Sequence, residues 1–261
     1  MTEPLVQTGQ TFTSALGVTR YAAILPEGYG DSARNGRRYP VIYLLHGIGG
    51  HEDEWLQGSR IGEYAAGREV ILVCADAARR CYVDSYDGTS PCETMAARDL
   101  VAFVDGTYRT IPRKEARGLM GLSMGGYGAL YLSLRHSHTF HAAASLSGAF
   151  SIGMAPLGRL APRLSQVNLL FPPSPFGRDQ WDLFAQARAA PPSVQHGLHW
   201  KLLCGTEDSL IEINRAFHHY LLAAGIDHQY DEYPGAHEWP FWDAHAGECL
   251  DFLAQHLVGA G

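Results

Sequence analysis

Short, uninterrupted apolar runs alternate along the chain with longer stretches in which apolar residues recur every three or four positions. The short runs predict strands buried on both faces, and the longer stretches, over residues 97–108, 210–224 and 242–257, predict amphipathic helices. This alternation is typical of an α/β fold, with a mostly parallel central sheet and helices on both faces. The runs that predict strands are Val18–Leu25, Pro40–Leu45, Val70–Ala75, Arg117–Gly121, Ala142–Leu146, Trp200–Cys204 and a less apolar seventh, Gln229–Tyr233.

One stretch, residues 150–195, breaks this rhythm. It holds seven of the fourteen prolines, and that density excludes a regular helix or a central strand. It is also rich in leucine and phenylalanine, and it follows the carboxyl end of a predicted strand, where α/β folds bind their ligands. It is either an irregular insertion over a site or a surface excursion that packs on the core. We expect one domain over residues 1–261, with 150–195 as a cap-like insertion.

Composition excludes several classes of protein. An apolar fraction of 46% and a formal charge of −7 exclude a disordered chain and a basic nucleic-acid-binding surface. No apolar run approaches the ~20 residues needed to cross a bilayer, and no signal peptide is evident. We therefore expect a cytoplasmic protein without nucleic-acid or membrane partners, and the sequence does not indicate its oligomeric state.

The cysteines do not suggest a metal site. There are five, an odd number, at irregular spacing, and none forms the paired C-x-x-C pattern of a zinc site. Cys81 and Cys92 flank a loop and either form a disulfide or remain free. We expect no bound metal.

The segment Gly121-Leu122-Ser123-Met124-Gly125-Gly126 contains the pattern G-x-S-x-G. The pattern alone is weak, but the predicted strand Arg117–Gly121 runs into it and a helical stretch over residues 128–134 follows it. A nucleophile elbow needs this strand–turn–helix context, because its serine sits on a tight turn where side chains would collide. We predict that Ser123 is the nucleophile; the alternative is a plain glycine-rich turn.

A nucleophilic serine needs backbone donors for the negative oxygen of its tetrahedral intermediate. The first is the N–H of Met124, next after Ser123. The second comes from the loop after an early strand, which here reads His46-Gly47-Ile48-Gly49-Gly50. We predict Ile48 N–H as this donor, with Gly49 as the alternative. A simple strand-ending turn is the other interpretation of this loop.

The serine also needs a base that is oriented by a carboxylate, and around a nucleophile elbow the chain order is Ser, acid, His. Asp208 follows the predicted strand Trp200–Cys204 and is the expected acid, with Glu207 as its local competitor. Of the six histidines after Asp208, only His237 falls in a loop between a predicted strand and a helix. We predict His237 as the base; a solvated loop histidine is the alternative.

Taken together, these motifs resemble the putative-esterase family of α/β hydrolases, which includes esterase D-like enzymes, tributyrin esterases, feruloyl esterases and mycobacterial mycolyltransferases. The resemblance covers most of the chain. It implies the α/β-hydrolase fold, a Ser123–Asp208–His237 triad and an oxyanion hole made by Ile48 and Met124. The segments that carry it are 11–29, His46–Gly50 with Trp55, Tyr108–Thr110, Gly121–Gly126, Ser145–Ala149, Gly205–Asp208 and Gly235–His237.

The function we expect is that of a cofactor-free serine carboxylesterase acting on short- to medium-chain acyl or aryl esters. The substrate is a small-molecule or carbohydrate-linked ester, with Gly49, Trp239 and Trp242 as expected contacts. Three alternatives remain at this point. They are an acyltransferase with the same triad, a thioesterase like S-formylglutathione hydrolase, and a non-catalytic binding protein on the same scaffold.

Overall fold

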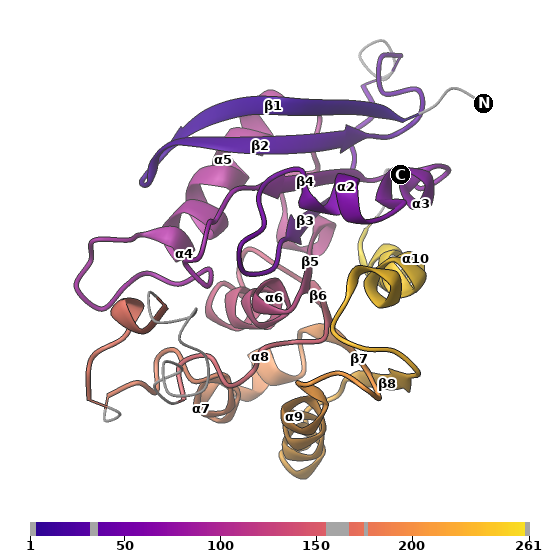
Figure 1. Cartoon of the computed structure of the whole chain (residues 1–261). Helices are drawn as coiled ribbons and strands as arrows, with labels where there is room; N and C mark the ends of the chain where they lie inside the picture. Colours follow the sequence, from indigo (N-terminus) through magenta and orange to yellow (C-terminus); the bar gives the residue numbers. More distant parts are fainter. Residues whose placement is uncertain (1–3, 32–35, 155–166, 175–176, 259–261) are drawn as a thin grey trace.

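Within residues 4–31, 36–154, 167–174 and 177–258, which the computed structural model describes, eight strands form one sheet in the order β1-β2-β4-β3-β5-β6-β7-β8 (Figure 1). The six strands from β4 to β8 in this order run parallel, and the hairpin β1–β2 joins them antiparallel. The strands are β1 (Leu5–Ser14), β2 (Gly17–Leu25), β3 (Val41–Leu45), β4 (Ile71–Ala75), β5 (Arg117–Leu122), β6 (Ala142–Leu146), β7 (His199–Gly205) and β8 (Gln229–Tyr233).

The seven predicted strands are confirmed, with ends that differ by no more than one residue. Every residue of β3, β4, β5 and β6 is buried, which explains why these strands are uninterrupted apolar runs. The strand β8 lies at the edge of the sheet and none of its residues is buried, so its apolar signal is weaker.

The strand β1 was not among the predicted runs. Only Phe12 of its ten residues is buried, because β1 lies at the other edge of the sheet and pairs with β2 alone. A strand that is exposed over most of its length carries no apolar run. The family resemblance, which begins at residue 11, covers only its end.

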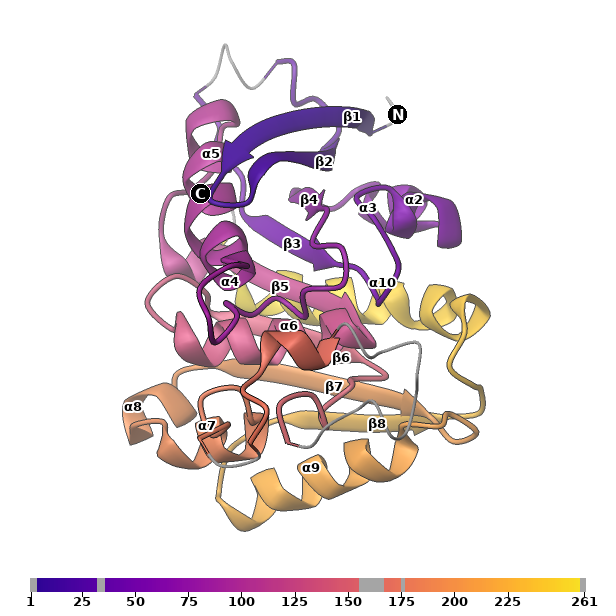
Figure 2. The same cartoon turned by 60° about the vertical axis from the view of Figure 1, so that its left-hand side comes forward.

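Helices cover both faces of the sheet, as predicted (Figures 1 and 2). One apolar core contains side chains from α2, α3 and α10, and the other contains side chains from α5, α6, α7 and α9. No helix in the described part of the chain is long and apolar enough to cross a membrane. The helices are α2 (Glu54–Gly58), α3 (Ile61–Ala65), α4 (Cys92–Thr94), η1 (Met95–Asp99), α5 (Leu100–Thr107), η2 (Lys114–Ala116), α6 (Met124–Arg135), η5 (Val167–Leu170), α7 (Leu183–Ala189), α8 (Pro192–Gln195), α9 (Ile211–Ala223) and α10 (Trp239–His256).

The proline-rich stretch after β6 packs on α6 and on the loop that follows β4. Tyr127 of α6 donates its hydroxyl hydrogen to the carbonyl of Trp181 at 2.6 Å, and the Trp181 indole donates to the carbonyl of Asp84 at 3.1 Å. The N–H of Tyr86 donates to the carbonyl of Leu170 at 2.9 Å. Residues 155–166 and 175–176 lie outside the described residues, and the cap-like insertion predicted over 150–195 falls partly on them.

All five cysteines are buried free thiols. Of the two alternatives for Cys81 and Cys92, the structure therefore shows the unbridged one. Burial raises the pKa of both thiols, that of Cys92 to about 12.

Candidate active site

Ser123 lies on the turn between β5 and α6, where the sequence predicts a nucleophile elbow. Its φ of 54° and ψ of −116° place a non-glycine residue in a strained part of conformational space. Two glycines make the turn possible. A Cβ on Gly121 would lie 2.1 Å from the carbonyl oxygen of Gly125, and one on Gly125 would lie 2.2 Å from the carbonyl oxygen of Leu45. The strand, the turn and the helix are therefore locked together by backbone contacts.

The structure brings Ser123, His237 and Asp208 together from three loops at the carboxyl edge of the sheet. Asp208 follows β7, and His237 lies between β8 and α10. His237 Nε2 is 2.9 Å from Ser123 Oγ, and His237 Nδ1 is 2.9 Å from Asp208 Oδ2 and 3.0 Å from Oδ1. A hydrogen on Nδ1 is donated to the carboxylate, which leaves Nε2 as an acceptor for the serine hydroxyl. This arrangement can remove a proton from Ser123.

The side chain of Asp208 is fully buried. Burial opposes its ionisation, but hydrogen bonds from His237, Ser147 and the N–H of Leu210 lower the pKa of the carboxyl below its ordinary value. The competing acid, Glu207, serves another purpose. Its carboxylate accepts a hydrogen bond from the N–H of Gly235 and so ties the acid loop to the histidine loop.

The loop after β3, where the sequence predicts the second oxyanion donor, is a tight turn held by hydrogen bonds. The N–H of Gly47 donates to Glu54 Oε2 at 3.1 Å, and the N–H of Gly50 donates to the carbonyl of Gly47 at 3.1 Å. These bonds leave the N–H groups of Ile48 and Gly49 as the remaining donors of the loop. Across from it, Met124 opens α6, and the first N–H groups of a helix have no partner inside it. The two alternatives for the second donor therefore stay predictions.

His46, as a neutral side chain, holds this loop in place through two hydrogen bonds. It is buried, and its Nε2 accepts a hydrogen bond from the N–H of Ala77 at 2.9 Å. Nδ1 must then carry the hydrogen, and it donates to the carbonyl of Gly47 at 2.7 Å. Burial is the main reason that the pKa of His46 is lowered, which keeps the ring uncharged.

Two polar side chains near the site were missed by the sequence reasoning. Glu54 sits against Gly50, where an added Cβ would lie 1.9 Å from its carboxylate. Burial raises its pKa, while the bond from Gly47 acts in the other direction. Ser147 follows β6 and belongs to the segment Ser145–Ala149, which resembles the family but for which the sequence predicted no role. Neither contact follows a local pattern: Ser147 accepts from Trp242, 95 residues away, and Glu54 reaches Gly47 from the start of the helix after the same loop.

The expected substrate contacts differ from one another in exposure. Trp242 is only 6% exposed, and its ring stands perpendicular to that of His237 at 5.0 Å between centroids. It thus packs behind the histidine, within the core. Trp239 is partly exposed and packs edge-on against Trp55 and Trp242, and Gly49 is exposed. Contact of Gly49, Trp239 or Trp242 with a substrate stays a prediction.

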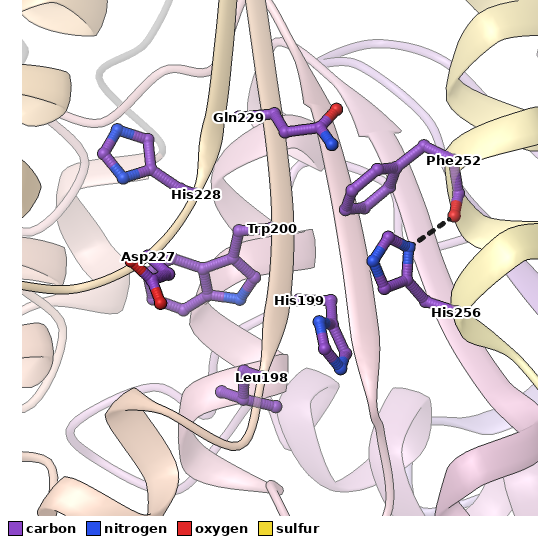
Figure 3. A pocket seen from close by; sticks show the side chains of 8 residues that line it. All are labelled: Leu198, His199, Trp200, Asp227, His228, Gln229, Phe252 and His256. Atoms are coloured by element: carbon purple, nitrogen blue, oxygen red, sulfur yellow. Dashed lines mark hydrogen bonds between the residues drawn. The ribbon is translucent and has the colours of Figure 1, made fainter.

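A cavity of about 230 Å³ lies at the opposite end of the sheet (Figure 3). His199 begins β7, Gln229 begins β8 and His256 ends α10, so these side chains gather at the amino edge of the sheet. Ser123, His237 and Asp208 lie at the carboxyl edge and do not line this cavity. The candidate active site is therefore defined by the hydrogen-bonded triad and not by this cavity.

Comparison with known proteins places the chain in an esterase family. The family model described as “Putative esterase” matches residues 14–248. An acetyl esterase from Caldicellulosiruptor saccharolyticus is 25% identical over 233 residues, which are 82% of this chain and 83% of that protein. Esterase Rv1288 from Mycobacterium tuberculosis is 30% identical over 252 residues, or 86% of this chain, and the chain spans only about half (54%) of that protein.

Solved structures show the same fold. A ferulic acid esterase superposes with a TM-score of 0.82 and 24% sequence identity, over 98% of this chain and 100% of the other. The match over both full lengths shows that the two chains share the α/β-hydrolase architecture.

Proposed function

The chain belongs to the putative esterase family of α/β hydrolases, and from this membership we propose that it is a serine carboxylesterase acting on short- to medium-chain acyl or aryl esters. The observation that carries the proposal is the continuous hydrogen-bonded path from Ser123 through His237 to Asp208, with 2.9 Å at its first step. A serine hydroxyl is a weak nucleophile until an adjacent base accepts its proton. This path supplies that base and holds it in place.

In the proposed reaction, His237 Nε2 takes the hydroxyl proton of Ser123 while Oγ attacks the ester carbonyl. The N–H groups of Met124 and Ile48 stabilise the resulting oxyanion, a contribution of roughly 3–4 kcal/mol for each donor. His237 then gives the proton to the leaving alcohol, and an acyl-serine remains. Water, deprotonated by His237, releases the acid and restores Ser123. Asp208 stabilises the imidazolium at both steps.

The proposed substrate class rests on the named relatives and on the site. One relative is named an acetyl esterase and one structural neighbour a ferulic acid esterase. The first name describes a short acyl group and the second an aromatic acid. In this chain Trp239 is partly exposed two residues after His237, where an aromatic side chain would contact the acyl group.

The test is turnover of p-nitrophenyl acetate, butyrate and octanoate and of methyl ferulate by the wild type and by Ser123→Ala. We expect the variant to lose at least about a thousandfold in kcat, because the nucleophile is gone and only binding and the oxyanion donors remain. Ser133→Ala is the matched control, since Ser133 is also a buried serine, on the far part of α6. Full turnover by Ser123→Ala would refute the proposal.

Two additions to this assay, glycerol as an acceptor and S-formylglutathione as a thioester substrate, separate the alternatives. An acyltransferase would form a new ester at the expense of free acid when glycerol is added as an acceptor. A thioesterase would prefer S-formylglutathione to every oxygen ester. A binding protein on this scaffold would turn over none of these substrates.

A further inference from the structure

We propose that Ser147 is a positioning residue that links the indole of Trp242 to the carboxylate of Asp208 and holds this acid in place behind His237. The proposal rests on the function proposed above. It concerns the loop after β6, which borders both the loop that holds Ser123 and the strand that leads to Asp208.

The backbone of Ser147, like that of the nucleophile, has a positive φ. Its φ is 50°, and that of Ser123, one strand away, is 54°. Each residue donates its N–H to the end of the next strand, Ser123 to Leu146 at 2.9 Å and Ser147 to Leu203 at 2.8 Å. Left-handed backbone is costly for a side chain other than glycine and persists where the surroundings require it. We therefore expect the side chain of Ser147 to have a function that requires this conformation.

The hydrogen bonds of the Ser147 hydroxyl indicate that role. Ser147 is fully buried, and its Oγ accepts a hydrogen bond from Trp242 Nε1 at 3.0 Å. Its own hydrogen must then go to another acceptor. Two acceptors lie beside it: the thiol of Cys204, next to the Leu203 whose carbonyl accepts the Ser147 N–H, and the carboxylate of Asp208 on the loop after the same strand. A carboxylate is much the stronger acceptor, so the hydrogen goes to Asp208.

Asp208 thus has donors on several sides. His237 Nδ1 and the N–H of Leu210 bind it from the loops after β8 and β7, and Ser147 binds it from the loop after β6. Of the neighbouring titratable groups, His237 forms the ion pair, while burial raises the pKa of the Cys204 thiol to about 12 and keeps it neutral. Each donor stabilises the carboxylate, and the hydrogen bond from Ser147 contributes to the lowered pKa of Asp208.

Loss of the Ser147 hydroxyl has a predictable sign. A carboxylate with one donor fewer holds the shared proton of the Asp208–His237 pair more tightly, so the pair gains its proton at a higher pH. Activity needs the unprotonated base, and the acid limb of the kcat/KM profile should move to higher pH. We expect a shift of about half a unit to one unit and a three- to tenfold lower kcat/KM at neutral pH, on the order of one hydrogen bond to a charged group.

Two variants and one control make the experiment decisive. Ser147→Ala removes the hydroxyl, and Ser147→Gly removes it while relieving the backbone strain, so at least one is expected to fold. Ser133→Ala is the control, because Ser133 is also fully buried and accepts from Trp200 Nε1 at 3.1 Å without touching the triad. The acid limb is measured with p-nitrophenyl acetate, and in parallel as the rate at which phenylmethanesulfonyl fluoride modifies Ser123. Both Ser147 variants should shift it, and Ser133→Ala should not.

An acid limb unchanged in both folded Ser147 variants would overturn the proposal and leave Ser147 a structural residue. Modification of Ser123 by phenylmethanesulfonyl fluoride needs no ester substrate, so it distinguishes this outcome from failure of the proposed function. If the wild type hydrolyses no ester but its Ser123 is still labelled, a shift in the labelling profile supports the role of Ser147 and only the substrate class is wrong. If Ser123 is not labelled at all, both proposals fail.

Discussion

A Cβ added to Gly125 would lie 2.2 Å from the carbonyl oxygen of Leu45, which belongs to the backbone at the end of β3. Backbone of a central strand cannot move aside as the end of a flexible side chain can. A substitution there must instead displace the first turn of α6, and with it Ser123 and the N–H of Met124. The geometry of the site therefore requires glycine at position 125, because even the single carbon of an alanine side chain would displace the nucleophile.

Gly125→Ala should therefore destabilise the protein by roughly 2 kcal/mol or more and reduce kcat by about a hundredfold, because a displaced nucleophile loses its alignment. Gly106→Ala is the matched control in another helix, where an added Cβ has no atom within 4 Å. It should stabilise the protein by about 0.5 kcal/mol through helix propensity and leave kcat unchanged. Chemical denaturation and p-nitrophenyl acetate turnover measure both. Equal behaviour of the two variants would contradict this account of the elbow.

At the scale of elements, Glu93 joins α4 to the end of α6. Its carboxylate, in a residue only 6% exposed, accepts hydrogen bonds from the Tyr131 hydroxyl at 2.9 Å, Arg135 Nε at 2.8 Å and His136 Nε2 at 2.9 Å. Burial alone would raise its pKa, but these bonds prevail and lower the pKa of Glu93 to about 2. The helix that carries the nucleophile is thus anchored at its far end by one ionised side chain.

Because the pKa of Glu93 in the folded protein lies below its ordinary value of 4.5, its ionised form stabilises the fold above pH 4.5. That stabilisation falls away as the pH drops from about 4.5 toward 2. Glu93→Gln should cost about 2 kcal/mol at pH 7, since it leaves Arg135 and the partly buried His136 without their ionised partner. The difference in Tm between the variant and the wild type should shrink at low pH. Calorimetry at several pH values tests this, and a difference that does not change with pH would exclude the ion pair as its cause.

At the scale of the whole molecule, all five thiols are buried, and four of them lie in the two apolar cores on either face of the sheet. Burial raises the pKa of each, so the native protein holds no accessible thiolate. Thiol reactivity consequently reports on opening of the fold as a whole.

Dithiobis-nitrobenzoate should therefore react slowly or not at all with the native protein and should titrate five thiols after denaturation without a reductant. Three thiols in the denatured protein would instead show that one pair of cysteines forms a disulfide, and Cys81 and Cys92 are the pair to test first. Fast reaction of the native protein would show that at least one core opens under native conditions. The absorbance of the released thionitrobenzoate counts the reactive thiols and distinguishes these results.

The sequence by itself determined the seven strands that carry apolar runs and the order in which the nucleophile, the acid and the base follow them. The reason is that a parallel sheet places the carboxyl ends of its strands along one edge, so residues such as Ser123 and Asp208 are brought together by topology alone. The strand context of the G-x-S-x-G pattern and the loop position of His237 are local features, and a local pattern reveals them.

Only the tertiary structure decided the contacts between segments far apart in the chain. It separated Asp208, which meets His237, from Glu207, which binds the backbone of Gly235. It also placed Trp242 against Ser147, 95 residues away in the chain. Such contacts depend on where a side chain points after the sheet and helices have packed, and neither hydrophobic periodicity nor spacing along the chain encodes that direction.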